Sequence, residues 1–288
     1  MPSPSAWLRA IRPLAHANIA PPILFGQALA LATTGHFSWI ALSIAQTFGV
    51  LDHLVVVFAN DFADRDADAS NTAPTPFSGG SRVLPEGLIA PRSIAMAGLG
   101  CALALLLGSI AIATRTTSMP WLALAAIVLI VAYSYPPLRL SYRGGGELLQ
   151  GLGVGVVLPL VGLAAQGAPI DTTALAWLVP TFVLGVAGNV LTSIPDAAAD
   201  RAANKRSPAA RWGERPARLV SIALHALALL AGALLLPLSI DRSLPVLGLG
   251  LTLLGASALR RVSTLAFVVL GGTVESVALV GWSIALVA

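Results

Sequence analysis

Residues 38–68 read SWIALSIAQTFGVLDHLVVVFANDFADRDAD, an apolar run that ends in a cluster of carboxylates. A helix of about 20 apolar residues crosses the roughly 30 Å hydrocarbon layer of a bilayer, so the run predicts a membrane-spanning helix. If that helix continues through the polar end, residues three and four apart share one face and Asp66 points away from it. The stripe on that face consists of Asn60, Asp61, Asp64 and Asp68.

A second acidic cluster ends another apolar run, 173–194. Asp196 and Asp200 form an i, i+4 pair there, followed by Lys205 and Arg206. The chain has only 13 carboxylates in 288 residues, yet six lie in these two clusters. Carboxylates at a membrane boundary are costly unless a cation or ligand needs them. Because magnesium is usually held by a few carboxylates together with phosphates, the clusters predict two halves of a Mg²⁺–diphosphate site.

The composition predicts an all-α membrane protein, because hydrophobic residues make up 56% of the chain and charged residues 10%. A soluble domain is about a quarter charged. We expect a single domain, 1–288, built as a bundle of about nine transmembrane helices with cytoplasmic cap loops. The expected spans are 14–34, 38–59, 93–113, 120–140, 147–167, 173–194, 219–239, 243–259 and 264–285.

The placement of basic residues predicts the orientation. With the N-terminus in the cytoplasm, only Arg115 and Arg242 of the 17 Lys and Arg residues fall on the far side. Such a bias follows the positive-inside rule. We therefore expect a multi-pass protein of the inner (plasma) membrane, with the N-terminus and the active-site loops cytoplasmic. The same bias accounts for the basic balance, so the lipid bilayer is the expected partner and nucleic acid is not.

Basic side chains near the acidic clusters are candidates for the diphosphate oxygens, because guanidinium forks and ammonium groups suit phosphate. These candidates are Arg82, Arg139, Lys205 and Arg206. The loop 69–92 is rich in turn formers, and we expect it to fold over the site. Asp52 and Glu275 lie deep in the expected spans, where either a ligand contact or an interhelical hydrogen bond would explain them.

Other interpretations of the acidic clusters exist. Each cluster alone could be a solvated helix end at which Asn and Asp act as caps. An ion-coupled transporter could use intramembrane acids, but its critical acids should lie near the bilayer midplane. Here both clusters lie at the ends of spans that share one membrane face, which favours a bound diphosphate.

The two motifs resemble those of the UbiA superfamily of intramembrane prenyltransferases. The family's Asn-Asp-x-x-Asp-x-x-x-Asp signature is similar to residues 60–68, and its Asp-x-x-x-Asp signature to residues 196–200. Its Tyr-x-x-x-Lys element resembles Tyr135 and Arg139, with arginine in place of lysine. Residues 142–148 look like the segment of the branch that prenylates dihydroxynaphthoate in menaquinone biosynthesis.

The resemblance implies a nine-helix bundle around a cavity open to lipid, and Mg²⁺-dependent transfer of a prenyl group from a polyprenyl diphosphate to an aromatic quinone precursor. Dihydroxynaphthoate and hydroxybenzoate are the expected kinds of acceptor, and a UbiA-type terpene cyclase is the alternative. The implied metal and catalytic residues are Asp61, Asp64, Asp68, Asp196 and Asp200. The implied substrate-binding residues are Asn60, Arg82, Tyr135, Arg139, Lys205 and Arg206.

Overall fold

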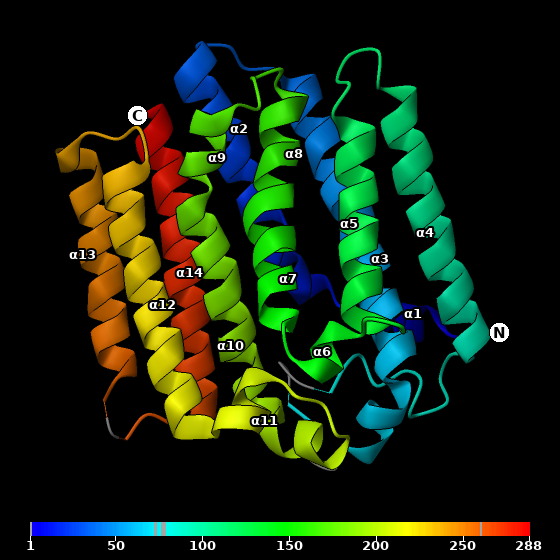
Figure 1. The fold of residues 1–288 in the computed structure, drawn as a ribbon. Coiled ribbons are helices and arrows are strands. Elements are labelled where there is room, and N and C mark those ends of the chain that lie inside the picture. Colours follow the sequence, from blue (N-terminus) through cyan, green and yellow to red (C-terminus); the bar gives the residue numbers. More distant parts are fainter. Residues whose placement is uncertain (1, 72–73, 76–78, 260) are drawn as a thin grey trace.

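The computed structural model describes residues 2–71, 74–75, 79–259 and 261–288, and over these residues it contains helices and no strand. Figure 1 shows long helices running side by side between two ends of a bundle. The short helices α6 (Leu140–Arg143) and α11 (Pro208–Trp212) lie together at one end, and the C-terminus lies at the other. The all-α prediction is confirmed.

Each predicted span coincides with a long helix or a helical run. These elements are α2 (Ala20–Thr34), α3 (Trp39–Ser70), α4 (Pro91–Ala111), α5 (Met119–Ser134), α7 (Gly146–Leu152) with the π-helix η2 (Gly153–Val157) and α8 (Leu158–Ala165), α9 (Thr172–Trp177) with α10 (Val179–Ala202), α12 (Glu214–Leu235), α13 (Ile240–Ser257) and α14 (Thr264–Val287). Before α2, the chain forms α1 (Pro4–Ile11) and the 3₁₀-helix η1 (Pro13–Asn18).

Over the described residues, seven helices or helical runs are long and apolar enough to cross a membrane. The other two predicted spans are α5, an apolar helix of only 16 residues, and α13. At 1.5 Å per residue, α5 alone covers about 24 Å of a hydrocarbon layer about 30 Å thick. The chain is a multi-pass membrane protein, and the crossing of α5 and α13 stays a prediction.

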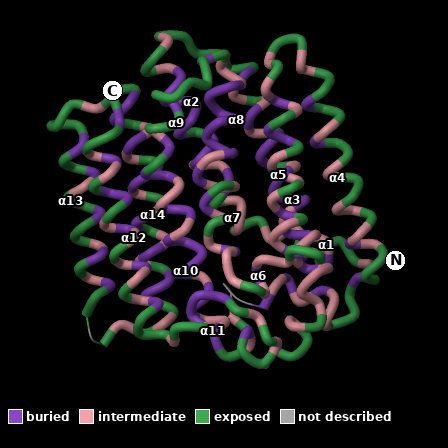
Figure 2. Tube along the Cα trace, in the orientation of Figure 1, coloured by how far each residue is buried: buried purple, intermediate pink, exposed green. Residues whose placement is uncertain are grey.

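The surface pattern agrees with a lipid environment. Figure 2 shows mostly exposed residues along α4 and α13 and mostly buried ones along α8 and α10. On α4, the exposed side chains include Met96, Leu99, Leu103 and Leu107. Apolar side chains on the outside of a bundle are unfavourable in water and are expected in contact with acyl chains. The outer helices therefore face lipid, and α8 and α10 form the inner layer.

Helices α2 and α8 cross at glycines. A Cβ atom on Gly26 would lie 1.9 Å from the carbonyl oxygen of Pro159, and one on Gly162 would lie 2.1 Å from that of Ile23. Small residues at a crossing let two membrane helices approach backbone to backbone, where packing replaces the hydrophobic effect as the source of association. This contact belongs to the largest buried apolar cluster of the bundle.

Helix α3 is longer than its predicted span and continues to Ser70, through the whole acidic motif. The side chain of Ser38 caps its start, accepting a hydrogen bond of 3.3 Å from the amide of Ala41. Helix α10 likewise continues through Pro195 to Ala202. Both acidic clusters therefore lie on regular helix, at the same end of the bundle.

Candidate active site

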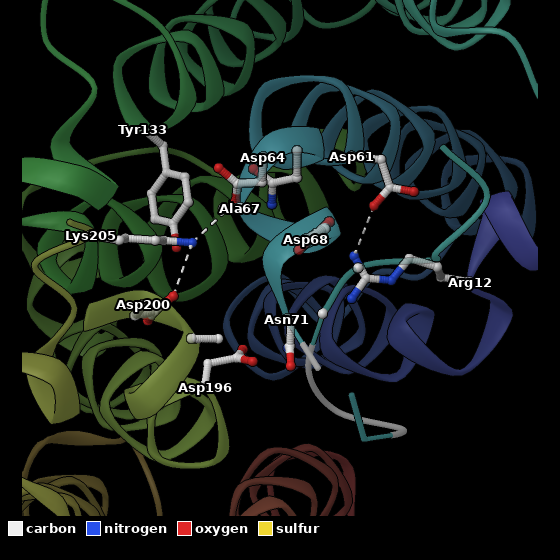
Figure 3. A pocket seen from close by; sticks show the side chains of 14 residues that line it. Arg12, Asp61, Asp64, Ala67, Asp68, Asn71, Tyr133, Asp196, Asp200 and Lys205 are labelled. Carbon is white, nitrogen blue, oxygen red and sulfur yellow. Dashed lines mark hydrogen bonds and ion pairs between the residues drawn. The ribbon is translucent and has the colours of Figure 1, made fainter. Parts of the chain in front are cut away.

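The acidic ends of α3 and α10 meet around one cavity of about 130 Å³. Figure 3 shows the Asp64 and Asp68 side chains on one side of it and Asp196 and Asp200 on the other. Seven of the predicted site residues line the cavity: Asn60, Asp61, Asp64, Asp68, Asp196, Asp200 and Lys205. The Asp66 side chain points away, with 90% of its surface exposed, as the helical spacing predicts.

Lys205 joins the two acidic helices. Its Nζ lies 3.1 Å from Asp64 Oδ2 on α3 and 3.9 Å from Asp200 Oδ1 on α10. A left-handed turn at Asn204, with φ 55°, precedes it, and the amide of Lys205 donates a 2.7 Å hydrogen bond to the carbonyl of Asp200. This turn directs the ammonium back into the cavity, as Figure 3 shows.

The pKa values of groups beside the cavity follow from burial and from the carboxylates. Burial by itself lowers the pKa of Lys205, but the negative charge of Asp64, with further help from Asp200, outweighs it and raises that pKa above its ordinary value. Burial, followed by the charge of Asp64, raises the pKa of Tyr142 to about 12. At neutral pH Lys205 is therefore positively charged, and the phenol of the neighbouring Tyr142 is uncharged.

Part of the loop 69–92 reaches the site, because Gly79 and Gly80 line the cavity. Residues 72–73 and 76–78 of that loop lie outside the described residues. The Ser81 amide donates a 3.3 Å hydrogen bond to Asp61 Oδ1, and its hydroxyl donates to Asp61 Oδ2. The guanidinium of Arg12 lies 3.6 Å from the same carboxylate. These contacts hold the first carboxylate of the motif in one orientation.

Gly80 lies against the carboxylates and gives a test of their placement. Its φ is +67°, and a Cβ atom would lie 2.2 Å from Asp68 Oδ2 and 3.1 Å from Asp61 Oδ1. Gly80→Ala is therefore expected to displace the Asp68 carboxylate and to reduce enzymatic turnover by about tenfold or more, because small misplacements of catalytic groups cost up to about a hundredfold.

Gly87→Ala is the matched control for that change. Gly87 has nearly the same φ, +66°, but a Cβ atom there would meet nothing within 4 Å. Both variants carry the same backbone strain, so the comparison isolates the crowding of the carboxylates. Turnover is measured on purified variants that have the same melting temperature. Equal turnover of Gly80→Ala and Gly87→Ala would contradict the role of this contact.

Hydrogen bonds around the cavity fix two more polar side chains. Asn60 Oδ1 accepts a 2.7 Å hydrogen bond from Ser134. The Tyr135 hydroxyl donates a 3.0 Å hydrogen bond to the carbonyl of Ala59 on α3, so it anchors the end of α5 to that helix. Neither contact involves a carboxylate of the motifs.

Four predicted substrate-binding residues lie outside the cavity lining. Tyr135 is one of them. Arg82 donates to the carbonyl oxygens at the end of α3, the guanidinium of Arg139 stacks 3.5 Å from the Tyr142 ring, and the amide of Arg206 donates to the Tyr142 carbonyl. In this structure the side chains of Arg82, Tyr135 and Arg139 are engaged with the protein, whereas Arg206 makes its contact through the backbone. The contact of all four with a diphosphate stays a prediction.

Sequence reasoning did not single out Arg12 or Tyr133, both of which line the cavity. Arg12 is one of the basic residues that the topology argument counts, and nothing in its surroundings singles it out. Tyr133, like its neighbour Ser134, is a polar side chain near the end of an apolar run. Its hydroxyl accepts a 3.4 Å hydrogen bond from Asn189, which also donates to Gln150 at 2.9 Å. A polar side chain at the end of an otherwise apolar run was the available signal.

The residues present fit a magnesium ion that shares its ligands with a phosphate. Asp64 Oδ1 is buried and has no hydrogen-bond partner among the residues that the structure describes, and a cation would satisfy it. Within the described ranges, no three His, Cys, Asp or Glu side chains form a ready-made metal cage. Magnesium keeps several waters and is bound through one or two carboxylates plus substrate phosphates, which is the arrangement that two separate acidic stripes provide.

Known proteins are similar to this chain in sequence and in fold. The model of the UbiA prenyltransferase family matches residues 19–266. The 1,4-dihydroxy-2-naphthoate octaprenyltransferase of Mycobacterium tuberculosis is 29% identical over 79% of this chain and 77% of its own. The lycopene elongase/hydratase of Corynebacterium glutamicum is 28% identical over 75% of this chain and 72% of its own. A UbiA homologue from Archaeoglobus fulgidus, solved with DMAPP and Mg²⁺, has the same fold, with a TM-score of 0.74, 18% identity and 98% of both chains covered.

Proposed function

Because this chain belongs to the UbiA prenyltransferase family and is a prenyltransferase, we propose that it transfers a prenyl group from a polyprenyl diphosphate to an aromatic acceptor. The acceptor is a quinone precursor of the dihydroxynaphthoate or hydroxybenzoate type, and diphosphate is released. One observation carries the proposal: carboxylates from α3 and α10 line a single cavity together with the Lys205 ammonium. A diphosphate that is shared between cations needs charges arranged in this way.

The carboxylates and the basic residues of the cavity have different roles in binding the diphosphate. The carboxylates of the two motifs would hold Mg²⁺, which when bound neutralises the charge that develops on the leaving diphosphate. Lys205 offers a fixed positive charge between Asp64 and Asp200. Arg12, 3.6 Å from Asp61, is a second cation in reach of the diphosphate. Charges placed in advance of the reaction stabilise its transition state without reorganisation.

The apolar interior of the bundle protects the allylic cation that remains when the C–O bond breaks. Water would capture such a cation, so a dry cavity is part of the mechanism. A ring carbon of the acceptor attacks it, and the ring then loses a proton or, for dihydroxynaphthoate, carbon dioxide. The electrons of the broken C–O bond leave with the diphosphate. The membrane also dissolves the long prenyl tail.

We place the acidic end of the bundle in the cytoplasm, in the inner (plasma) membrane. The basic residues that follow α10, among them Lys205 and Arg206, and those that precede α2, Arg9 and Arg12, lie at this end and support that orientation. The diphosphate headgroup of the prenyl substrate and soluble aromatic acids would then reach the site at the cytoplasmic face. We treat residues 1–288 as one domain.

The decisive experiment is an assay of membranes with labelled prenyl diphosphate and a panel of aromatic acids. We expect a prenylated product only with Mg²⁺ and a matching acid, and complete loss of product after chelation with EDTA. Identification of the products by mass spectrometry defines the acceptor. Conversion of the prenyl diphosphate to a hydrocarbon without any acid would overturn the proposal in favour of a terpene cyclase.

A further inference from the structure

A histidine–glutamate pair lies inside the bundle, away from the acidic cavity. His225 lies near the middle of α12 and Glu275 near the middle of α14, and both helices pack against α10. His225 Nε2 lies 3.2 Å from Glu275 Oε1. Ionisable side chains at this depth in a membrane protein are costly and mark functional sites by default. The transfer mechanism described above uses neither residue.

The hydrogen bonds of His225 determine what the pair can offer a ligand. Its Nδ1 lies 2.7 Å from the carbonyl oxygen of Ser221, which can only accept, so Nδ1 carries a proton. A second proton must lie between Nε2 and Glu275 Oε1, since two lone pairs would otherwise face each other at 3.2 Å. Whether the pair is imidazolium and carboxylate or imidazole and carboxylic acid, the other oxygen, Oε2, can only accept a hydrogen bond.

The two side chains differ in their access to a ligand. The side chain of His225 is 1% exposed and that of Glu275 is 20% exposed. Among the described residues, Glu275 Oε2 has no hydrogen-bond partner. The carboxylate is therefore the more accessible member of the pair, and a ligand that binds at Oε2 must supply a hydrogen-bond donor.

Helix α10 makes room for this carboxylate and relates it to the acidic cavity. A Cβ atom on Gly188 would lie 2.8 Å from Glu275 Oε1 and 3.3 Å from Oε2. Gly188 precedes Asp196 by eight residues on the same helix, which is a rise of about 12 Å. The pair therefore lies deeper in the bundle than the diphosphate site, on a helix common to both.

We propose that Glu275 Oε2 accepts a hydrogen bond from a hydroxyl group of the aromatic acceptor, and that His225 is the positioning residue that holds the carboxylate. The inference rests on the proposed function. An ionised prenyl diphosphate consists of acceptor oxygens and hydrocarbon, so the substrate group able to donate is a ring hydroxyl. The pair is thereby a specificity site for hydroxylated rings.

The test compares Glu275→Gln with Glu275→Met. In Glu275→Gln the amide nitrogen can donate to His225 Nε2, which leaves its carbonyl oxygen as the acceptor, and we expect the KM for the acceptor within about threefold of the unaltered enzyme. Glu275→Met keeps the length of the side chain but has no comparable acceptor. Loss of a hydrogen bond of this kind should raise that KM by about tenfold or more, with prenyl diphosphate binding unchanged. Ser276→Ala, an exposed neighbour on α14, is the control.

The second arm uses an acceptor whose ring hydroxyl is methylated. This analogue has no proton to donate, so its KM should be the same with the unaltered enzyme and with Glu275→Met. Equal KM values of Glu275→Met and the unaltered enzyme for the hydroxylated acceptor would overturn the proposal, as would a parallel loss of prenyl diphosphate binding. Failure of the proposed function itself has a different signature: the unaltered enzyme would bind prenyl diphosphate but form no acceptor-dependent product.

Discussion

The double substitution Asp64→Asn and Asp196→Asn is expected to reduce prenyl transfer by about a thousandfold or more. Asparagine keeps the size of each side chain but removes the negative charge that a divalent cation needs, and metal stabilisation of a leaving group is worth several kcal/mol. Asp64 carries a buried oxygen that has no hydrogen-bond partner in the described part of the chain, and Asp196 lines the same cavity from α10. The measurement is product formation at saturating Mg²⁺ and prenyl diphosphate.

Asp66→Asn provides the matched control. This residue belongs to the same acidic run of α3, but its side chain is 90% exposed and points away from the cavity. We expect it to leave turnover within about twofold of the unaltered enzyme, since surface substitutions have small effects. Near-normal turnover in the double variant would rule out a metal–diphosphate site between α3 and α10. A loss as large in Asp66→Asn would show that overall charge, and not the cavity, is responsible.

Gly26→Ala is expected to destabilise the bundle. The effect should be larger than that of a Gly→Ala change at a glycine with no close neighbours. The new methyl would lie 1.9 Å from the carbonyl oxygen of Pro159, a backbone atom, so α2 and α8 must separate. Overpacking of this kind costs about 3 kcal/mol. At about 2–4 °C per kcal/mol for a chain of this size, the melting temperature of the detergent-solubilised protein should fall by about 6 °C or more. Gly162→Ala, on the facing helix, should act in the same way.

Gly108→Ala is the control for the helix crossing. Gly108 also lies within a long apolar helix, α4, but a Cβ atom there would meet nothing within 4 Å. Alanine has the higher helix propensity, so this variant should be as stable as the original or slightly more stable. If Gly26→Ala melts at the same temperature as Gly108→Ala, the close approach of α2 and α8 is not a determinant of stability.

Much of the site could be predicted from the sequence because its residues repeat at helical spacing. Once α3 continues through its acidic motif, the 3.6-residue period alone places Asp64 and Asp68 on one face and Asp66 on another. The spans were predictable for a related reason, since length and hydropathy decide which helices cross a bilayer. The short helix α5 shows where this reasoning becomes less certain: its expected span was 120–140, but the helix ends at Ser134.

The remaining parts of the site depend on turns, and turn geometry leaves little trace in a sequence pattern. Arg12 reaches Asp61 from a left-handed position, φ 51°, between α1 and η1. Arg139 is also left-handed, with φ 45°, and its guanidinium lies against the Tyr142 ring outside the cavity lining. Proximity in sequence to a motif predicted that Arg139 would be near the site, but it could not predict the direction of its side chain.

The glycine crossing of α2 and α8 also has an evolutionary consequence. Since the nearest atoms that a Cβ would meet at Gly26 and Gly162 are backbone atoms, no compensating side-chain replacement elsewhere can make room for one. Homologues that keep this crossing should therefore have glycine at both sites, whereas Gly100 and Gly108 on α4, where a Cβ meets nothing within 4 Å, are free to drift. Sequence divergence in this lineage should thus be slow at these two crossing positions, where the constraint comes from the backbone of the facing helix.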